Sequence, residues 1–127
     1  PPNDIAAVTA CLASRNDVAA VMIEPTGATF GMVPTGAEFL RQLRAVTSAH
    51  NVLLFFDEVI CGFRCSPGGA QQFFNVIPDI TTLAKILAGG LPGAAVCGRA
   101  DVLGLLNYGS GHASPPKVVH QGTYNAG

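Results

Sequence analysis

The sequence has little charge, and its charges show no excess of one sign. Only 12% of the 127 residues are charged, and the net charge is −1. No basic stripe is available to neutralise phosphates, so we expect no nucleic-acid partner and no anionic membrane surface as partner. A typical soluble domain carries roughly 25% charged residues. Because 49% of the residues are hydrophobic, we expect part of the apolar surface to face further chain or a partner subunit.

Long apolar runs and metal-binding motifs are also lacking. No run approaches the ~18–20 apolar residues of a membrane span, so we expect no membrane segment. Cys61 and Cys65 are spaced C-x3-C, but neither Cys11 nor Cys97 supplies a second pair, and the three histidines have no metal-like spacing. We therefore expect no metal site, and buried free thiols in a reducing compartment such as the cytoplasm.

The two ends of the sequence predict an internal piece of a longer protein. The chain begins at Pro1 without a methionine and stops at GTYNAG, residues 122–127, without a closing element. Its length of 127 residues corresponds to one ordinary domain. We therefore expect residues 1–127 to form one domain that is only partly present.

Helix and strand patterns alternate along the chain. Residues 18–24 and 52–59 are apolar runs that include acids near their ends, which is typical of parallel strands covered on both faces. Between them, Thr35 and Glu38 form a T-x-x-E capping box that predicts the start of a helix of about four turns. Strand, helix and strand then make a right-handed βαβ unit. The buried stripe of this helix is expected at Phe39, Leu40, Leu43 and Val46.

The other predicted elements are shorter. We expect a helix over residues 4–16 capped by Asp4, a helix over 70–76 that buries Phe73 and Phe74 and ends at Pro78, strands over 79–84 and 94–98, and a helix over 100–107 that buries Val102, Leu105 and Leu106. A polar, Gly-rich tail follows from residue 108. The whole pattern predicts an α/β fold with a mostly parallel sheet and flanking helices.

Three of the predicted strands lead into groups that can carry chemistry. Glu24 ends the first, Asp57 and Glu58 end the second, and Lys85 follows the third. Ligands of open α/β sheets bind outside the carboxyl ends of the strands, so we expect these groups to converge there. Strand ends are also polar simply because they meet solvent, and position alone leaves both interpretations open.

Asp57 follows four apolar residues, so its carboxylate must find a cation or several hydrogen-bond donors. It could cap a helix, pair with Arg64 or Arg99, or pair with a cationic ring nitrogen. Lys85 stands in an apolar segment that, if desolvated, favours the neutral amine and exposes its lone pair. The alternative is a lysine with a buried stem and a solvated head. The pair Gly89-Gly90 would let a ligand approach closely.

Two weaker features complete the set. Gly122 and Thr123 offer a backbone amide and a hydroxyl suited to phosphate, but G-T-Y-N is also an ordinary turn. The loop TGATFG, residues 26–31, could touch a ring or a phosphate, or could simply connect a strand to a helix. A nucleotide-binding module is disfavoured, because neither G-x-G-x-x-G nor G-x-x-x-x-G-K-[ST] occurs where such a module needs it.

Taken together, these motifs resemble a known family. IEP at 23–25, FFDEVICGFR at 55–64, PDITTLAKILAGGLP at 78–92 and HQGTYNAG at 120–127 are similar to the class III aminotransferases, which use pyridoxal 5'-phosphate. Within them the chain is most similar to the glutamate-1-semialdehyde 2,1-aminomutase group and its aminotransferase relatives. The order and spacing of D-E-V-x-x-G-F-R and T-x-x-K-x-x-x-G-G make the resemblance specific.

The resemblance implies part of the large domain of the type I pyridoxal-phosphate fold, without the N-terminal segment and the small C-terminal domain. It also implies a homodimer with active sites at the interface, acting on small-molecule amines and keto acids or aldehydes. Lys85 would form the internal aldimine, Asp57 would pair with the pyridine nitrogen, and Thr123 would bind phosphate. Glu24 and Glu58 would shape the cofactor site.

Two departures from the aminomutase pattern favour a related aminotransferase. Thr29 stands where the aminomutases carry an asparagine near the cofactor ring. The tail reads G-T-Y-N where the aminomutases tend to read G-T-L-S. The aminomutase reaction remains the alternative activity, and the 127 residues on their own could be an inactive fragment.

Overall fold

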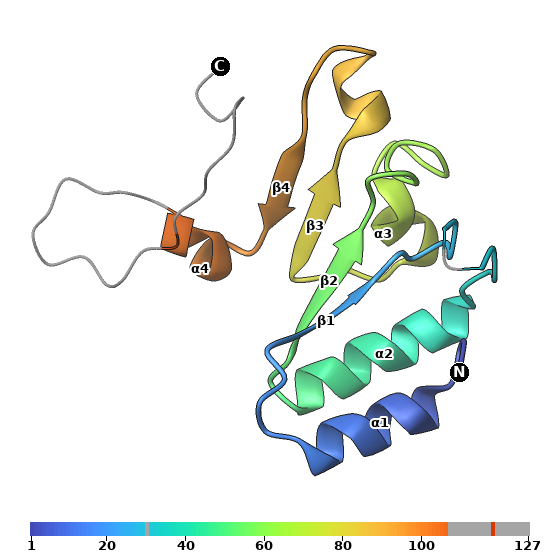
Figure 1. Ribbon diagram of the computed structural model, residues 1–127, viewed down its shortest axis with the longest axis vertical. Helices are drawn as coiled ribbons and strands as arrows, with labels where there is room; N and C mark the ends of the chain where they lie inside the picture. Colours follow the sequence, from blue (N-terminus) through green and yellow to red (C-terminus); the bar gives the residue numbers. More distant parts are fainter. Residues whose placement is uncertain (30, 107–117, 119–127) are drawn as a thin grey trace, which may run out of the picture.

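The computed structural model describes residues 1–29, 31–106 and 118, which build a twisted sheet flanked by helices (Figure 1). Three strands are parallel, in the order β1-β2-β3, and β4 is antiparallel to β3. The predicted mostly parallel α/β arrangement is confirmed. The elements are α1 (Ile5–Ser14), β1 (Ala20–Ile23), α2 (Ala37–Ala49), β2 (Leu53–Asp57), α3 (Gly69–Phe74), β3 (Ile80–Leu83), η1 (Lys85–Ala88), β4 (Ala95–Gly98), α4 (Ala100–Leu103) and η2 (Gly104–Leu106).

The βαβ unit sets the edge at which the candidate residues gather. Helix α2 connects β1 to β2, which pair in parallel with Ile23 opposite Phe56. Strand β3 continues the parallel set, with Thr82 opposite Asp57. Parallel strands end at the same edge of a sheet. The residues that follow β1, β2 and β3 therefore lie along one edge.

The core lies on one face of the sheet. Leu54 and Phe56 of β2 are fully buried against Leu40 and Leu43 of α2 and against Val76. Helix α1 packs beside α2 on the same side (Figure 1). Burying these aliphatic and aromatic side chains stabilises the fold by roughly 1.5–3 kcal/mol each.

The opposite face of the sheet is uncovered in the described chain. Met22 of β1 is 57% exposed and Val96 of β4 is 42% exposed. The expectation that the parallel strands are covered on both faces is therefore wrong for the described residues. The reason is that α1, α2, Phe74 and Val76 all contribute to a core on the same side of the sheet.

The helix starts are predicted correctly in one case and wrongly in another. The carboxylate of Asp4 caps α1 by accepting from the Ala7 amide at 2.9 Å, as expected. Helix α2, however, is capped at Gly36, whose amide donates to the side chain of Asn3 at 2.9 Å. The Thr35 hydroxyl donates instead to the Glu24 carbonyl oxygen. A residue distant in sequence thus replaces the local capping box.

The short helices are less buried than their apolar residues predict. Phe73 of α3 is 61% exposed, and only its neighbour Phe74 packs against the core. The helix ends at Phe74 because Asn75 adopts a left-handed conformation, well before Pro78. No residue of α4 or η2 is buried, and Leu105 is exposed. Val102, Leu105 and Leu106, which were expected to be buried, are therefore not fully covered by any element of the described chain.

All four cysteines are free thiols, but they are not all buried as expected. Cys61 is buried and Cys65 is partly buried, whereas Cys11 and Cys97 are exposed. Cys97 lies on the edge strand β4, and Cys11 lies on the outer side of α1. An apolar sequence context did not distinguish a core position from an edge position.

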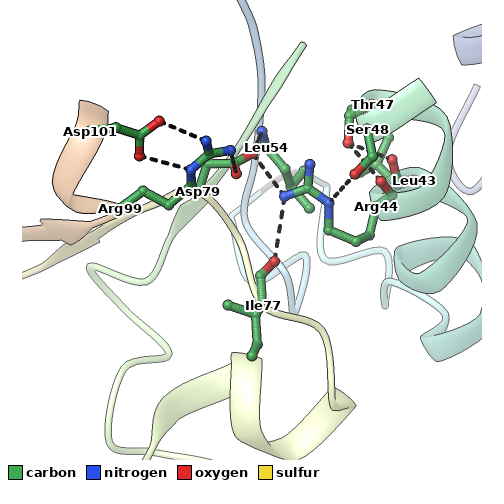
Figure 2. Close-up of polar contacts among 9 residues, drawn as sticks. All are labelled: Leu43, Arg44, Thr47, Ser48, Leu54, Ile77, Asp79, Arg99 and Asp101. Atoms are coloured by element: carbon green, nitrogen blue, oxygen red, sulfur yellow. Dashed lines mark hydrogen bonds and ion pairs between the residues drawn. The ribbon is translucent and has the colours of Figure 1, made fainter. Parts of the chain in front are cut away.

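A buried carboxylate, Asp79, connects four parts of the fold (Figure 2). Its Oδ2 accepts from the Leu54 amide at 2.7 Å and from Arg44 Nη1 at 2.8 Å. Its Oδ1 accepts from Arg99 Nη1 at 3.0 Å. Its backbone bonds to Leu54 and Arg99 as well, and Arg99 also pairs with Asp101 at 2.7 Å. One side chain thus joins α2, β2, the start of β3 and the end of β4.

The titration of Asp79 reflects this network. Burial raises the pKa of the Asp79 carboxyl, but the Leu54 amide, Arg44 and Arg99 outweigh burial and hold the pKa below its usual value. A depressed folded-state pKa means that the ionised group stabilises the fold above the unfolded-state pKa of about 4. This contribution is lost as pH falls through the lower folded-state pKa.

We predict that Asp79→Asn in the whole protein lowers the free energy of unfolding by about 2–4 kcal/mol, because two arginines lose their shared anion. Urea unfolding at neutral pH measures the loss, and the difference between variant and wild type should shrink as the pH falls below about 4. Asp101→Asn is the control, since Asp101 is exposed and its one ion pair within the described residues is with Arg99. Equal losses in the two variants would contradict the assignment.

Candidate active site

Asp57 presents a carboxylate at the carboxyl end of β2. It is half-buried on the uncovered face, because it alternates with the buried Phe56. Its Oδ1 accepts from the Val59 amide at 3.1 Å and from the Thr82 hydroxyl at 3.2 Å. Among the described residues, Oδ2 has no hydrogen-bond partner and the carboxylate has no ion pair. One oxygen is therefore held by the protein and the other is available to a ligand.

One alternative predicted from the sequence was a salt bridge between Asp57 and Arg64 or Arg99. Arg99 pairs with Asp79 and Asp101 instead, at the opposite edge of the sheet. Arg64 is exposed and forms no ion pair within the described part of the chain. Asp57 also caps no helix, because its bonds go to Val59 and to the neighbouring strand. Neither structural role expected for Asp57 is therefore seen among the described residues, and a ligand cation remains a prediction.

Lys85 follows β3 at the same edge and has an unusual backbone. It begins η1 with a φ of 49°, in the left-handed region that residues other than glycine rarely adopt. Such strain costs on the order of 1–3 kcal/mol and is concentrated at functional sites. Its amine has no hydrogen bond or ion pair with any described residue. Gly89 and Gly90 follow with positive φ, and a side chain at either would meet nothing within 4 Å.

The apolar, desolvated setting expected for Lys85 is wrong for the described chain. Lys85 is exposed, and so are its neighbours Ile86 and Leu87. The reason is that η1 makes no extensive contact with any other described element. Desolvation of this amine therefore requires a ligand or further polypeptide.

Glu58 lies next to Asp57 in sequence but on the other side of the sheet. Its side chain is 1% exposed, and its Oε2 accepts from the Ala70 amide at 2.6 Å. A side chain at Gly69, whose φ is +72°, would come within 2.3 Å of the same oxygen, so this close approach requires glycine. Glu58 thus ties the segment after β2 to α3. Its placement fits a role in shaping the site, and direct contact with a cofactor remains a prediction.

Cys61 lies beside Glu58, with its sulfur 3.8 Å from Oε2. Burial, together with the charge of Glu58, raises the pKa of Cys61 to about 12. The thiolate is the nucleophilic form of cysteine. Cys61 is therefore a packed thiol that stays protonated at neutral pH.

Glu24 and Thr29 meet at the end of β1. The Glu24 carboxylate accepts from the Thr29 amide at 2.7 Å and also from the Thr29 hydroxyl. The loop after β1 therefore folds back on the strand end. Both residues line a cavity of about 630 Å³, together with Met22, Thr35 and Phe39. Neither Asp57 nor Lys85 lines this cavity, so Glu24 and Thr29 occupy a different part of the edge from these two residues.

The remaining sequence-predicted features add no further group. Thr123, with Gly122, lies outside the described residues. Within residues 1–29, 31–106 and 118, no group of three His, Cys, Asp or Glu side chains could hold a metal ion. No described helix is long and apolar enough to cross a membrane.

Thr82 begins the motif T-x-x-K, but its role is what sequence reasoning missed. It contacts Asp57 because Asp57 and Thr82 are register partners in adjacent strands. The sequence gives two threonines in a row, and only the register shows that Thr82 and not Thr81 faces the carboxylate. Alternation along β2 and β3 carries that signal only once the pairing of the two strands is known.

Comparison with curated proteins identifies the relatives of the chain. It is 51% identical to a glutamate-1-semialdehyde 2,1-aminomutase of Methanoregula boonei over 106 residues, which cover 84% of the chain and 26% of the relative. It is 44% identical to the enzyme of that name from Sulfolobus acidocaldarius over 115 residues, which cover 91% of the chain and 26% of the relative. The chain thus spans about a quarter of the length of these relatives.

Solved structures give a consistent picture. An omega-transaminase from Sphaerobacter thermophilus matches with a TM-score of 0.84 and 38% identity, over 99% of this chain and 28% of that one. A glutamate-1-semialdehyde aminomutase from Pseudomonas aeruginosa, in complex with PMP, matches with a TM-score of 0.71 and 35% identity. The match covers 94% of this chain and 26% of that one. The sequence model of the class-III aminotransferases matches residues 3–127. The chain belongs to the class-III aminotransferase family.

Proposed function

We propose that the protein carrying this chain catalyses amino-group transfer with pyridoxal 5'-phosphate, between a small-molecule amine and a keto acid or aldehyde. The observation that carries the proposal is the pair formed by Asp57 and Lys85. A carboxylate oxygen and an amine, both without partners in the described chain, follow adjacent parallel strands. Family membership supports the same activity. The 127 residues could be inactive alone, so the proposal concerns the whole protein.

The donor set at this edge fits the cofactor. Asp57 offers an anion to a protonated ring nitrogen, and Lys85 offers a primary amine to an aldehyde. Glu24 and Glu58 are already engaged by Thr29 and Ala70, so they would shape the site and not grip the cofactor. We include Thr29 in the rim of the site and Thr123 as a phosphate ligand on the resemblance alone.

When bound, the cofactor supplies an electron-accepting ring that stabilises negative charge on a substrate carbon. Asp57 would keep the ring nitrogen protonated through a charge-assisted hydrogen bond worth roughly 1.5–3 kcal/mol. The Lys85 amine would take the proton from the substrate carbon that bears nitrogen and would later return a proton, acting as base and then as acid. Both roles use groups that the described fold leaves without partners.

The second candidate is intramolecular transfer, as in glutamate-1-semialdehyde 2,1-aminomutases. The curated relatives that carry this name favour it, at 44–51% identity. Thr29, in place of asparagine, and the higher TM-score of the transaminase, 0.84 against 0.71, favour transfer between two molecules. The two reactions differ by product: a mutase converts one amino aldehyde alone, whereas a transaminase needs an added acceptor.

We also propose that the protein is a homodimer. Exposed apolar side chains such as Met22 and Leu91, 57% and 76% exposed, support a partner surface. We propose further that the protein lies in the cytoplasm. Four free thiols, two of them exposed, support a reducing compartment. Residues 1–127 would then be part of the cofactor-binding domain of each subunit.

We predict that borohydride fixes the cofactor on Lys85 when the whole protein is loaded with pyridoxal 5'-phosphate. Peptide mass spectrometry locates the added mass. Lys117 is the other lysine of the chain, so Lys117→Ala is the matched control and should retain the label, while Lys85→Ala loses it. Labelling of Lys117, or of neither lysine, would refute the assignment.

A second prediction concerns the charge of Asp57. Asp57→Asn keeps the shape of the side chain but removes the anion. The protonated ring nitrogen would then lose the carboxylate that accepts its hydrogen bond. We expect kcat/KM to fall roughly 10- to 150-fold, which corresponds to the loss of about 1.5–3 kcal/mol. Lys85 should still take the borohydride label, because attachment does not require the anion. Unchanged kcat/KM would remove Asp57 from the mechanism.

A further inference from the structure

We propose that Thr82 is a positioning residue that orients the carboxylate of Asp57 toward the cofactor ring. The inference rests on the proposed function, in which Asp57 Oδ2 binds the ring nitrogen. Thr82 begins the motif T-x-x-K, but neither the motif nor the relatives assign this residue a role. Its basis is the cross-strand contact between β3 and the end of β2.

The geometry fixes which carboxylate oxygen is available. Asp57 and Thr82 are register partners, and the Thr82 hydroxyl donates to Oδ1 at 3.2 Å. The Val59 amide donates to the same oxygen at 3.1 Å. The terminal torsion of aspartate is broad and roughly two-fold, so an unheld carboxylate would rotate. Two donors on Oδ1 hold the group in one orientation and leave Oδ2 for the ligand.

The Val59 donor is anchored without the Thr82 side chain. The segment of Val59 is held by Glu58, whose amide donates to the Thr82 carbonyl at 3.0 Å and whose carboxylate is bound at α3. Its carbonyl also accepts from Gly62 at 2.9 Å. None of these bonds uses the Thr82 side chain. The hydroxyl is the one side-chain donor to Asp57 in the described chain, so its removal isolates the positioning effect.

The size of the effect follows from the contact. The hydroxyl fixes the direction of Oδ2 and leaves the anion itself in place, so its loss would weaken the contact with the ring nitrogen without removing it. The distance of 3.2 Å is longer than the usual ~2.7–2.8 Å of a hydroxyl donor. We therefore expect roughly a three- to tenfold loss of cofactor affinity, and not the larger loss that removal of the anion itself would cause.

The test compares Thr82→Val with Thr82→Ser in the whole protein. Valine keeps the branched shape and removes the hydroxyl, while serine keeps the hydroxyl. Thr81→Val is the matched control: it is the same change one position earlier, opposite Phe56 on the other face. Absorbance titration gives the Kd for pyridoxal 5'-phosphate. The nitrogen-15 chemical shift of the labelled cofactor reports whether the ring nitrogen is protonated.

We expect Thr82→Val to weaken the Kd about three- to tenfold and to move the nitrogen-15 shift toward the unprotonated ring. Thr82→Ser and Thr81→Val should both resemble wild type. If valine prevents folding, Thr82→Ala removes the same hydroxyl and is judged by the same two measurements.

Two results would overturn the inference while leaving the proposed function intact. One is a Thr82→Val protein with wild-type Kd and nitrogen-15 shift. The other is an equal change of Kd and nitrogen-15 shift in Thr81→Val, which would show that loss of either hydroxyl of β3 has the same effect. A wild-type protein that retains no cofactor on Lys85 after borohydride would instead overturn the proposed function, and this inference with it.

Discussion

The fold depends on one buried carboxylate with two cations. Asp79 precedes β3 and binds Arg44 from α2, Arg99 from the end of β4 and the amide of Leu54 in β2 (Figure 2). A buried carboxylate without partners would be costly, and two arginines with a backbone donor offset that cost. The network sets where β3 starts relative to β2. It therefore also sets which residue of β3 lies opposite Asp57.

The two edges of the sheet divide the polar groups between stability and chemistry. At the amino-terminal edge of the parallel strands, Asp79 has all its partners inside the described chain. At the carboxyl edge, one oxygen of Asp57 and the amine of Lys85 have no partner among the described residues. In a chain with 12% charged residues, such unpaired groups at one edge are a specific feature. They are what a ligand with a cationic nitrogen and an aldehyde would complete.

The sequence was sufficient to predict the order of the helices and strands and the edge of the sheet at which the candidate residues gather. The apolar runs that end near Glu24 and Asp57 predicted parallel strands, and the βαβ rule placed their ends together. The hydrogen bond from the Gly36 amide to the Asn3 side chain could not be foreseen, since the two residues lie 33 positions apart and the contact depends on how α1 packs. The roles of Thr82 and Asp79 required the register. Local pattern determines which strands form, but pairing determines which side chains meet.

Exposure was the property that the sequence predicted least well. Ile86 and Leu87 suggested an apolar pocket around Lys85, yet both are exposed because η1 makes no extensive contact with any other described element. Phe73 and Cys97 are exposed for the same reason, on the outer side of α3 and on the edge strand. Hydrophobic residues mark surfaces that need covering, and they do not identify what covers them. This limit is physical, since burial is a property of the assembled molecule.

The contrast between Asp57 and Lys85 matches the work that the proposed function gives them. Asp57 is held by Thr82 and by Val59, and the segment of Val59 is itself anchored through Glu58. A residue that keeps a ring nitrogen protonated gains from such fixed geometry, because its charge must stay in one place throughout the reaction. Lys85 must instead move a proton between two atoms. Its side chain makes no competing bond with any described residue, its backbone is left-handed, and two glycines follow it. The edge therefore combines Asp57, which is held by two donors, with Lys85, whose amine is not held by any described residue. The register near Asp79 places Asp57 beside β3, the strand that Lys85 follows.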